Sequence, residues 1–353
     1  MSYTEVKKPA FFVSYLDYLQ NIGQIAYQDD PLNDIHLLNP SKTHRVDGMN
    51  TDSTQEIIFE FNGDVHYQNL IDEDDYIYIF VLGHNFHSTD ATIKISLGYE
   101  NEQGSTSFVD CSVIEEIVNY NGSETKPNYN GFSIFKVQYS NLTSINSVKI
   151  IIKAIGDSSG KTIKVGSVSL CTKWTPPHNP NLDLKMSRVF DGVKNQITQG
   201  GSTISNAQHT RNGSFWSVGY PWDLFQDDNE EYEIGGVNST LKLSRTLGRR
   251  LWEMNFDYLD PENIMPEVES YTIFETEHDS VFNTTLHNNT KSFLRILNRV
   301  QGSHLPFIFL PNYTDLNFNP DQWALVRFNQ DEFAVSQVAP SLYSMSLQIE
   351  ESW

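Results

Sequence analysis

Apolar and polar residues alternate along several short stretches in the first half of the chain. A period of two is typical of a strand that is buried on one face. Residues 75–83 are instead apolar at almost every position, which predicts a central strand buried on both faces. The alternating stretches place on one face Ile57, Phe59 and Phe61, then Ile93, Ile95, Leu97 and Tyr99, and then Val148, Ile150 and Ile152.

Further strands are expected in residues 132–139 and 162–174, and loops rich in glycine and asparagine separate the set. Short strands at this spacing predict an antiparallel β-sandwich over residues 46–173. The order of these strands, with an acidic loop before the central strand and a final strand reading KVGSVSL, resembles the galactose-binding-like jelly rolls of carbohydrate-binding modules.

The second half, residues 185–353, combines strands with one helix. Trp252, Met254, Phe256 and Tyr258 alternate with polar residues, which predicts a half-buried strand. A helix is expected near residues 290–301, ended by Gly302, with an apolar face of Phe293, Leu294, Leu297 and Val300. Four strands follow it, reading LPFIFLPN, WALVRFNQ, FAVSQVA and YSMSLQIEE, so we expect a mainly β protein with a barrel-like C-terminal domain.

Two segments fall outside these domains. Residues 1–45 hold too few apolar residues for a core of their own, so we expect an arm, in which Phe11–Gly23 forms a short helix or strand. Residues 174–184 carry three prolines, which exclude a helix and predict an extended linker.

Charge and composition narrow the function classes. The net charge of −21 argues against nucleic acid as a direct partner, because binding to phosphates calls for a basic face. The N-terminal sequence does not resemble a signal peptide, and no apolar run is long enough to span a bilayer, so we expect synthesis in a cytoplasm and no membrane insertion. Cys111 and Cys171 are expected to be buried free thiols.

The second half is similar to a class of bacteriophage tail and baseplate proteins. An opening strand, SRVFDG, precedes a glycine-rich GGSTIS segment and an RNGSFW segment, and a strand of the type LWEMNFDYL follows. A helix then precedes GS-x-x-PFIF-x-P, W-x-x-x-RF and a final SMSLQIEE strand. The resemblance to distal-tail and tail-hub proteins implies a virion protein that forms a ring-like homo-oligomer and binds other phage tail proteins.

Candidate chemistry is sparse. No catalytic residue or cofactor is assigned. Clustered acids at 72–75 and 227–231 are expected to be solvated loops rather than calcium ligands, and His84 and His87 are a poor zinc pair on a strand end. Residues 200–205 lack the lysine of a phosphate loop and predict a turn. The remaining hypothesis is that three aromatic residues are exposed and contact an interface or a sugar, with packing in a core as the alternative. They are Trp216, Tyr220 and Trp222.

The expected function is therefore a structural role in a phage tail or baseplate, with docking of neighbouring tail proteins or fibres. Two other classes stay open. In the first alternative, the sandwich is a module that binds a host glycan. In the second alternative, the protein is a carbohydrate-active enzyme with a carboxylate pair that the sequence does not single out among its 45 acids.

Overall fold

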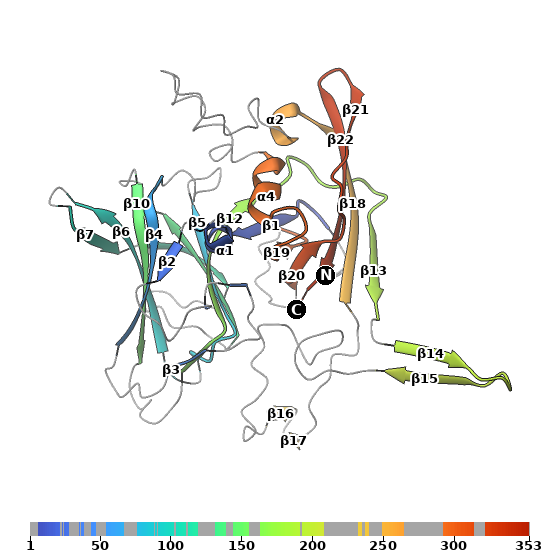
Figure 1. The fold of residues 1–353 in the computed structure, drawn as a ribbon, viewed down its shortest axis with the longest axis horizontal. Helices are drawn as coiled ribbons and strands as arrows, with labels where there is room; N and C mark the ends of the chain where they lie inside the picture. Colours follow the sequence, from blue (N-terminus) through green and yellow to red (C-terminus); the bar gives the residue numbers. More distant parts are fainter. Residues whose placement is uncertain are drawn as a thin grey trace.

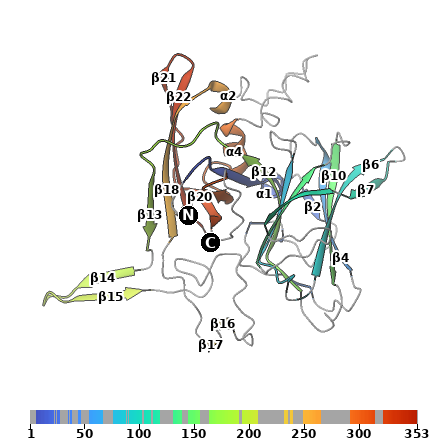
Figure 2. The ribbon, with the colours of Figure 1, turned by 180° about the vertical axis from the view of Figure 1, so that it is seen from behind.

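A computed structural model gives the fold of the protein (Figure 1, and from behind in Figure 2). It describes residues 6–21, 23, 25–27, 35, 37–38, 44–46, 54–66, 76–87, 89, 91–101, 104–110, 112–118, 131–138, 144–154, 163–190, 193–207, 232–234, 237–239, 249–264, 292–313 and 322–352. Strands dominate this part of the chain, which confirms the expectation of a mainly β protein.

An eleven-stranded antiparallel sheet runs through the whole molecule. Each strand of this sheet pairs with the next strand in the following spatial order. The strands are β13 (Lys185–Val189), β18 (Arg249–Leu259), β22 (Leu342–Glu351), β20 (Ala324–Phe328), β19 (Phe307–Leu310), β1 (Ala10–Ser14), β12 (Ser167–Trp174), β5 (Ile77–Leu82), β9 (Phe132–Gln138) and β8 (Ser112–Val118), with β21 (Val335–Ala339) paired to β22.

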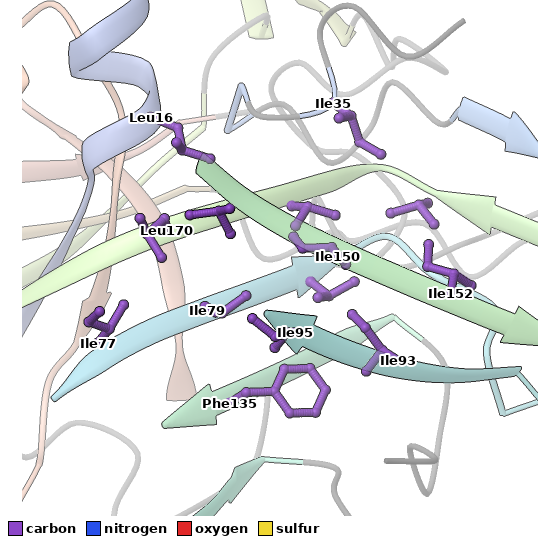
Figure 3. Packing of buried hydrophobic residues seen from close by; sticks show 14 of the residues in the cluster. Leu16, Ile35, Ile77, Ile79, Ile93, Ile95, Phe135, Ile150, Ile152 and Leu170 are labelled. Atoms are coloured by element: carbon purple, nitrogen blue, oxygen red, sulfur yellow. The ribbon is translucent and has the colours of Figure 1, made fainter. Parts of the chain in front are cut away.

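A second, five-stranded sheet packs against the β12–β5–β9 end of the large sheet (Figure 1). Its strands are β2 (Ile25–Tyr27), β4 (Thr54–His66), β10 (Ser144–Ala154), β6 (Ala91–Glu100) and β7 (Thr106–Asp110), in that spatial order. Ile79 and Phe135 from the large sheet share one buried cluster with Ile95 and Ile150 from the small sheet (Figure 3). This sandwich is the arrangement that the alternation of apolar residues predicts.

Strand β1 lies in the middle of the large sheet and joins its two halves. It pairs with β12 on one side and with β19 on the other, and all five of its residues are buried. Phe11 packs against Phe309 with ring centroids 5.3 Å apart, and Phe12 packs on the opposite face against Phe80 and Trp323, each with ring centroids 5.3 Å from its own. The segment that follows, α1 (Tyr15–Asn21), is buried over most of its length.

The N-terminal segment thus differs from the expected arm wherever the structure describes it. The expectation rested on the small number of apolar residues in 1–45, but the core around β1 is supplied by strands distant in sequence. The strands of the second half likewise do not close into a barrel in the described chain, because β1 extends their sheet into the sandwich.

The remaining elements are short. Paired strands are β3 (His44–Val46) with β11 (Ile163–Val165), β14 (Val193–Ile197) with β15 (Thr203–Ala207), and β16 (Tyr232–Ile234) with β17 (Val237–Ser239). Helices α2 (Pro261–Ile264) and α4 (Phe293–Val300) lie beside the second half of the large sheet (Figure 1). No helix of the described chain combines the length and the apolar character needed to cross a membrane.

Helix α4 lies within the expected range and buries Phe293 and Val300 of its expected apolar face, but two arginines are buried with them. Ser292 caps its N-terminus by accepting a hydrogen bond from the Leu294 amide, and a left-handed Gln301 ends it. Arg295 and Arg299 are buried, whereas Leu294 and Leu297 are only half-buried. The Arg299 guanidinium lies 4.7 Å from the centroid of the Tyr15 ring and donates to the Thr172 hydroxyl, so contacts with α1 and β12 hold the arginine inside.

Candidate functional site

The β14–β15 hairpin projects from the body of the molecule (Figure 1). Its turn is closed by hydrogen bonds from the Thr198 amide to the Ser202 carbonyl at 2.8 Å and from the Gly201 amide to the Thr198 carbonyl at 2.9 Å. Gly201 has a φ of +81°, a conformation that a glycine adopts at little cost. The GGSTIS segment is therefore a hairpin turn with its second strand, as the sequence indicates, and not a phosphate loop.

Nothing in the described chain covers this hairpin. The described side chains from Lys194 to Ser205 are exposed, apart from a half-buried Thr198. Ile197 is 78% exposed and Ile204 is 56% exposed. Because Ile197 pairs with Thr203 while Ile204 pairs with Gln196, the two isoleucines lie on opposite faces. An isolated two-stranded hairpin is at best marginally stable in water, which makes this exposed hairpin a candidate docking site.

The hairpin also differs in charge from the rest of the protein. Residues 193–207 contain one charged side chain, Lys194, and no acid, in a chain whose net charge is −21. A surface that complements this hairpin would therefore be apolar and acidic rather than basic.

The sheet edge that leads into the hairpin is open. Among the described strands, β13 pairs only with β18, and its burial is low along its length. Lys185 on β13 bonds Glu253 on β18 at 2.8 Å, which places a charge on this edge. Charged side chains on edge strands oppose indiscriminate pairing with other sheets, so the projecting hairpin, rather than β13 itself, is the better candidate for a specific contact.

A second exposed apolar site lies at the far end of β18. The sequence expectation placed Tyr258 on the buried face with Phe256, but the register of β18 against β22 shifts between Phe256 and Leu259. This bulge buries Leu259 and leaves Tyr258 69% exposed with a φ of +58°. A β-bulge adds one residue to a strand and redirects the side chains around it, which is why simple alternation fails here.

The structure places in the core His84, the first residue of the histidine pair that the sequence analysis considered for zinc. His84 is buried; its Nδ1 accepts a hydrogen bond from the Phe86 amide at 3.4 Å, and its Nε2 lies 2.8 Å from the Ser133 hydroxyl. Burial lowers the pKa of His84 to about 3, so the ring is neutral. Its hydrogen bonds hold the loop that follows β5. Within the described residues, no three histidine, cysteine or acidic side chains gather as metal ligands do.

Several sequence candidates lie outside the described residues. They are the aromatic set Trp216, Tyr220 and Trp222, the acidic clusters at 72–75 and 227–231, and Cys111. Their roles stay predictions. Cys171 is a buried free thiol, as expected, and burial raises its pKa above the usual range.

A buried carboxyl that the sequence did not single out lies where α1 meets the sandwich. Asp17 accepts a hydrogen bond from the Leu38 amide on Oδ2 at 3.3 Å, while its Oδ1 has no hydrogen-bond partner. Its own amide donates to the Ser14 hydroxyl, which in turn lies 2.6 Å from the Ser169 hydroxyl. Burial raises the pKa of Asp17 to about 7, against the opposing effect of these hydrogen bonds and of Arg327.

We expect the Asp17→Asn variant to change the pH dependence of stability. Between pH 3.8, the ordinary pKa of aspartate, and about pH 7, the folded protein holds a proton that the unfolded chain has released. The wild type therefore loses stability relative to the variant as pH rises through this window, by up to about 4 kcal/mol for a shift of about 3 pKa units.

The measurement is urea unfolding of both proteins from pH 4 to pH 8. The comparison must be between the two, because neutral burial of His84 acts in the opposite direction and destabilises the fold as pH falls. Asp331→Asn, at an exposed aspartate, is the matched control. A difference between wild type and Asp17→Asn that stays constant with pH contradicts the prediction.

Comparisons with known proteins identify no family. No protein-family model matches the sequence, and no curated protein matches it. One solved structure that the chain matches is a pectin-binding carbohydrate-binding module, at 12% identity and a TM-score of 0.19, over 41% of this chain and 87% of that chain. At that TM-score the likeness carries no argument about function.

Proposed function

We propose that this protein is a structural subunit of a phage tail or baseplate, and that it assembles with copies of itself. The observation that carries the proposal is the projecting β14–β15 hairpin, whose two faces each expose an isoleucine and which no described part of the same chain covers. The resemblance of residues 185–353 to tail and baseplate proteins supplies the kind of assembly. The proposed location is the virion, after assembly in the host cytoplasm.

The body of the molecule is suited to such a role. Strand β1 ties the sandwich and the second half into one sheet, so a force or a contact on one half is transmitted to the other through paired backbone. No catalytic step is proposed, and the function is the symmetric packing of subunits and the presentation of docking surfaces to neighbouring tail proteins.

The hairpin hypothesis predicts a loss of assembly in the double variant Ile197→Asp and Ile204→Asp. Each change replaces an exposed apolar contact with an acid, in a protein that is already strongly negative, so association is expected to weaken at least tenfold. The measurement is the molar mass by light scattering over a range of concentrations.

A matched control is Thr106→Asp, at an exposed position on β7 at the opposite side of the molecule (Figure 1). This variant is expected to assemble as the wild type does. Circular dichroism and the unfolding midpoint should not change in the hairpin variant, because the two isoleucines are exposed in the single chain. Unchanged assembly of the hairpin variant would argue against the proposal.

A further inference from the structure

The exposed end of β18 carries a second surface, built from the linker and the bulge. We define the β18 patch by the exposed apolar residues Leu182 and Tyr258, with Asp183 and Asp257 beside them. The Asn181 side chain donates to Asp257 at 2.6 Å, and the Asn255 side chain donates to Asp183 at 2.7 Å. These bonds hold the linker against β18 on both sides of Leu182.

The backbone at Tyr258 is strained. A φ of +58° is an outlier for a bulky side chain and costs on the order of 1–3 kcal/mol. This strained conformation turns the aromatic ring to solvent, where the ring contributes little to the stability of the single chain. A strained residue that presents an aromatic side chain at the surface is typical of a binding site.

The β18 patch complements the hairpin in charge. Residues 179–184 and 255–264 contain no basic residue, and their acids are Asp183, Asp257, Asp260 and Glu262. Asp183 and Asp257 accept hydrogen bonds from neutral asparagine amides, and neither forms a salt bridge within the described residues. One face of the hairpin offers the opposite combination, with Ile204 as an apolar group and Lys194 as the only charge.

In the single chain the hairpin and Tyr258 lie far apart. Val189, at the end of β13 that leads to the hairpin, pairs with Arg249, and Tyr258 lies nine residues further along β18, about 30 Å away at ~3.3 Å per residue. Each hairpin strand has five residues and spans only about 17 Å. The hairpin also leaves the sheet at the end remote from α2, which follows Tyr258 (Figure 1).

We propose that the β14–β15 hairpin of one copy binds the β18 patch of a second copy, with Ile204 against Leu182 and Tyr258 and with Lys194, on the same face of the hairpin, near Asp183 and Asp257. This inference rests on the proposed function and names the surface that self-assembly uses. Because the donor and acceptor surfaces differ, the contact is head-to-tail, and it repeats from copy to copy into a ring or a filament.

Cysteine cross-linking of the full-length chain tests the contact. Two variants are made in a Cys111→Ser background, one with Ile204→Cys and one with Leu182→Cys, while the buried Cys171 stays. Each variant alone is expected to give few disulfide-linked dimers under mild oxidation. An equimolar mixture is expected to give a heterodimer, and the chain with both changes is expected to give a ladder of linked copies.

Charge reversal provides a second, independent measurement. Lys194→Glu is expected to weaken association about tenfold, and the added changes Asp183→Lys and Asp257→Lys are expected to restore it. The Asp183→Lys and Asp257→Lys variant without the hairpin change is the control, and it should associate as weakly as Lys194→Glu.

The outcomes separate this inference from the proposed function. If the wild type does not assemble at all, both are wrong. If it assembles and the Ile197→Asp, Ile204→Asp variant does not, but the mixture gives no heterodimer and charge reversal restores nothing, then the hairpin binds another surface and only this inference is overturned.

Discussion

Replacing Glu351 with alanine is expected to lower the free energy of unfolding by about 3–5 kcal/mol, because it leaves the buried Arg250 without its counter-charge. Glu351 is 1% exposed. Its Oε1 accepts from the Arg250 Nε at 2.7 Å, and its Oε2 accepts from the Arg250 amide at 2.6 Å. Arg250 also donates to the Trp323 carbonyl, so the pair ties β18 and β22 to the start of β20.

The neighbouring pair provides a matched control. Arg249 and Glu350 lie 2.9 Å apart but keep side-chain exposures of 22% and 18%. Glu350→Ala is therefore expected to cost about 1 kcal/mol, as more exposed ion pairs do. Urea unfolding of the two alanine variants checks the difference, and equal effects at the two positions would show that burial of the Arg250–Glu351 pair does not matter.

Replacing Phe12 with alanine is expected to destabilise both halves of the molecule together, by about 3–5 kcal/mol. Phe12 is fully buried and packs against Tyr78 and Phe80 of the sandwich side and against Trp323 of the second half. The cavity left by its ring thus removes contacts on both sides of β1, and the chain should still unfold in one transition.

Hydrogen exchange combined with urea unfolding distinguishes destabilisation of both halves from destabilisation of one half alone. Amides of β6 and β10 in the sandwich and of β19 and β20 in the second half should lose protection by the same free energy. Phe190→Ala, the same change at a half-exposed phenylalanine, should cost less than about 1 kcal/mol. Loss of protection in the second half alone would mean that β1 does not couple the two halves.

The alternation of apolar residues was sufficient to predict the sandwich. Val148, Ile150 and Ile152 lie in its buried cluster, as do Ile93, Ile95 and Leu97. This success has a physical reason, since a strand with one face in a core repeats every two residues. The same reasoning predicts no position for β1, because its partners are more than 150 residues away in sequence and both of its faces are buried.

The candidate interface was harder to predict from sequence. Tyr258 continues the apolar alternation of its strand, and only the bulge before Leu259 turns it outward. Ile197 and Ile204 flank a glycine turn, which the sequence does indicate, but nothing in the local pattern shows that the hairpin leaves the body of the molecule. The burial of Arg299 was also missed, because its partners Tyr15 and Thr172 come from other elements.

Self-assembly is the central claim, and the molar mass of the wild-type protein in solution tests it most directly. Light scattering is measured across a range of concentrations, at low and at high salt. The account predicts discrete oligomers or growing assemblies that weaken at high salt, since a lysine and aspartates contribute to the contact. A protein that stays monomeric at the highest concentration and lowest salt would contradict the account and would favour the hypothesis of a glycan-binding module.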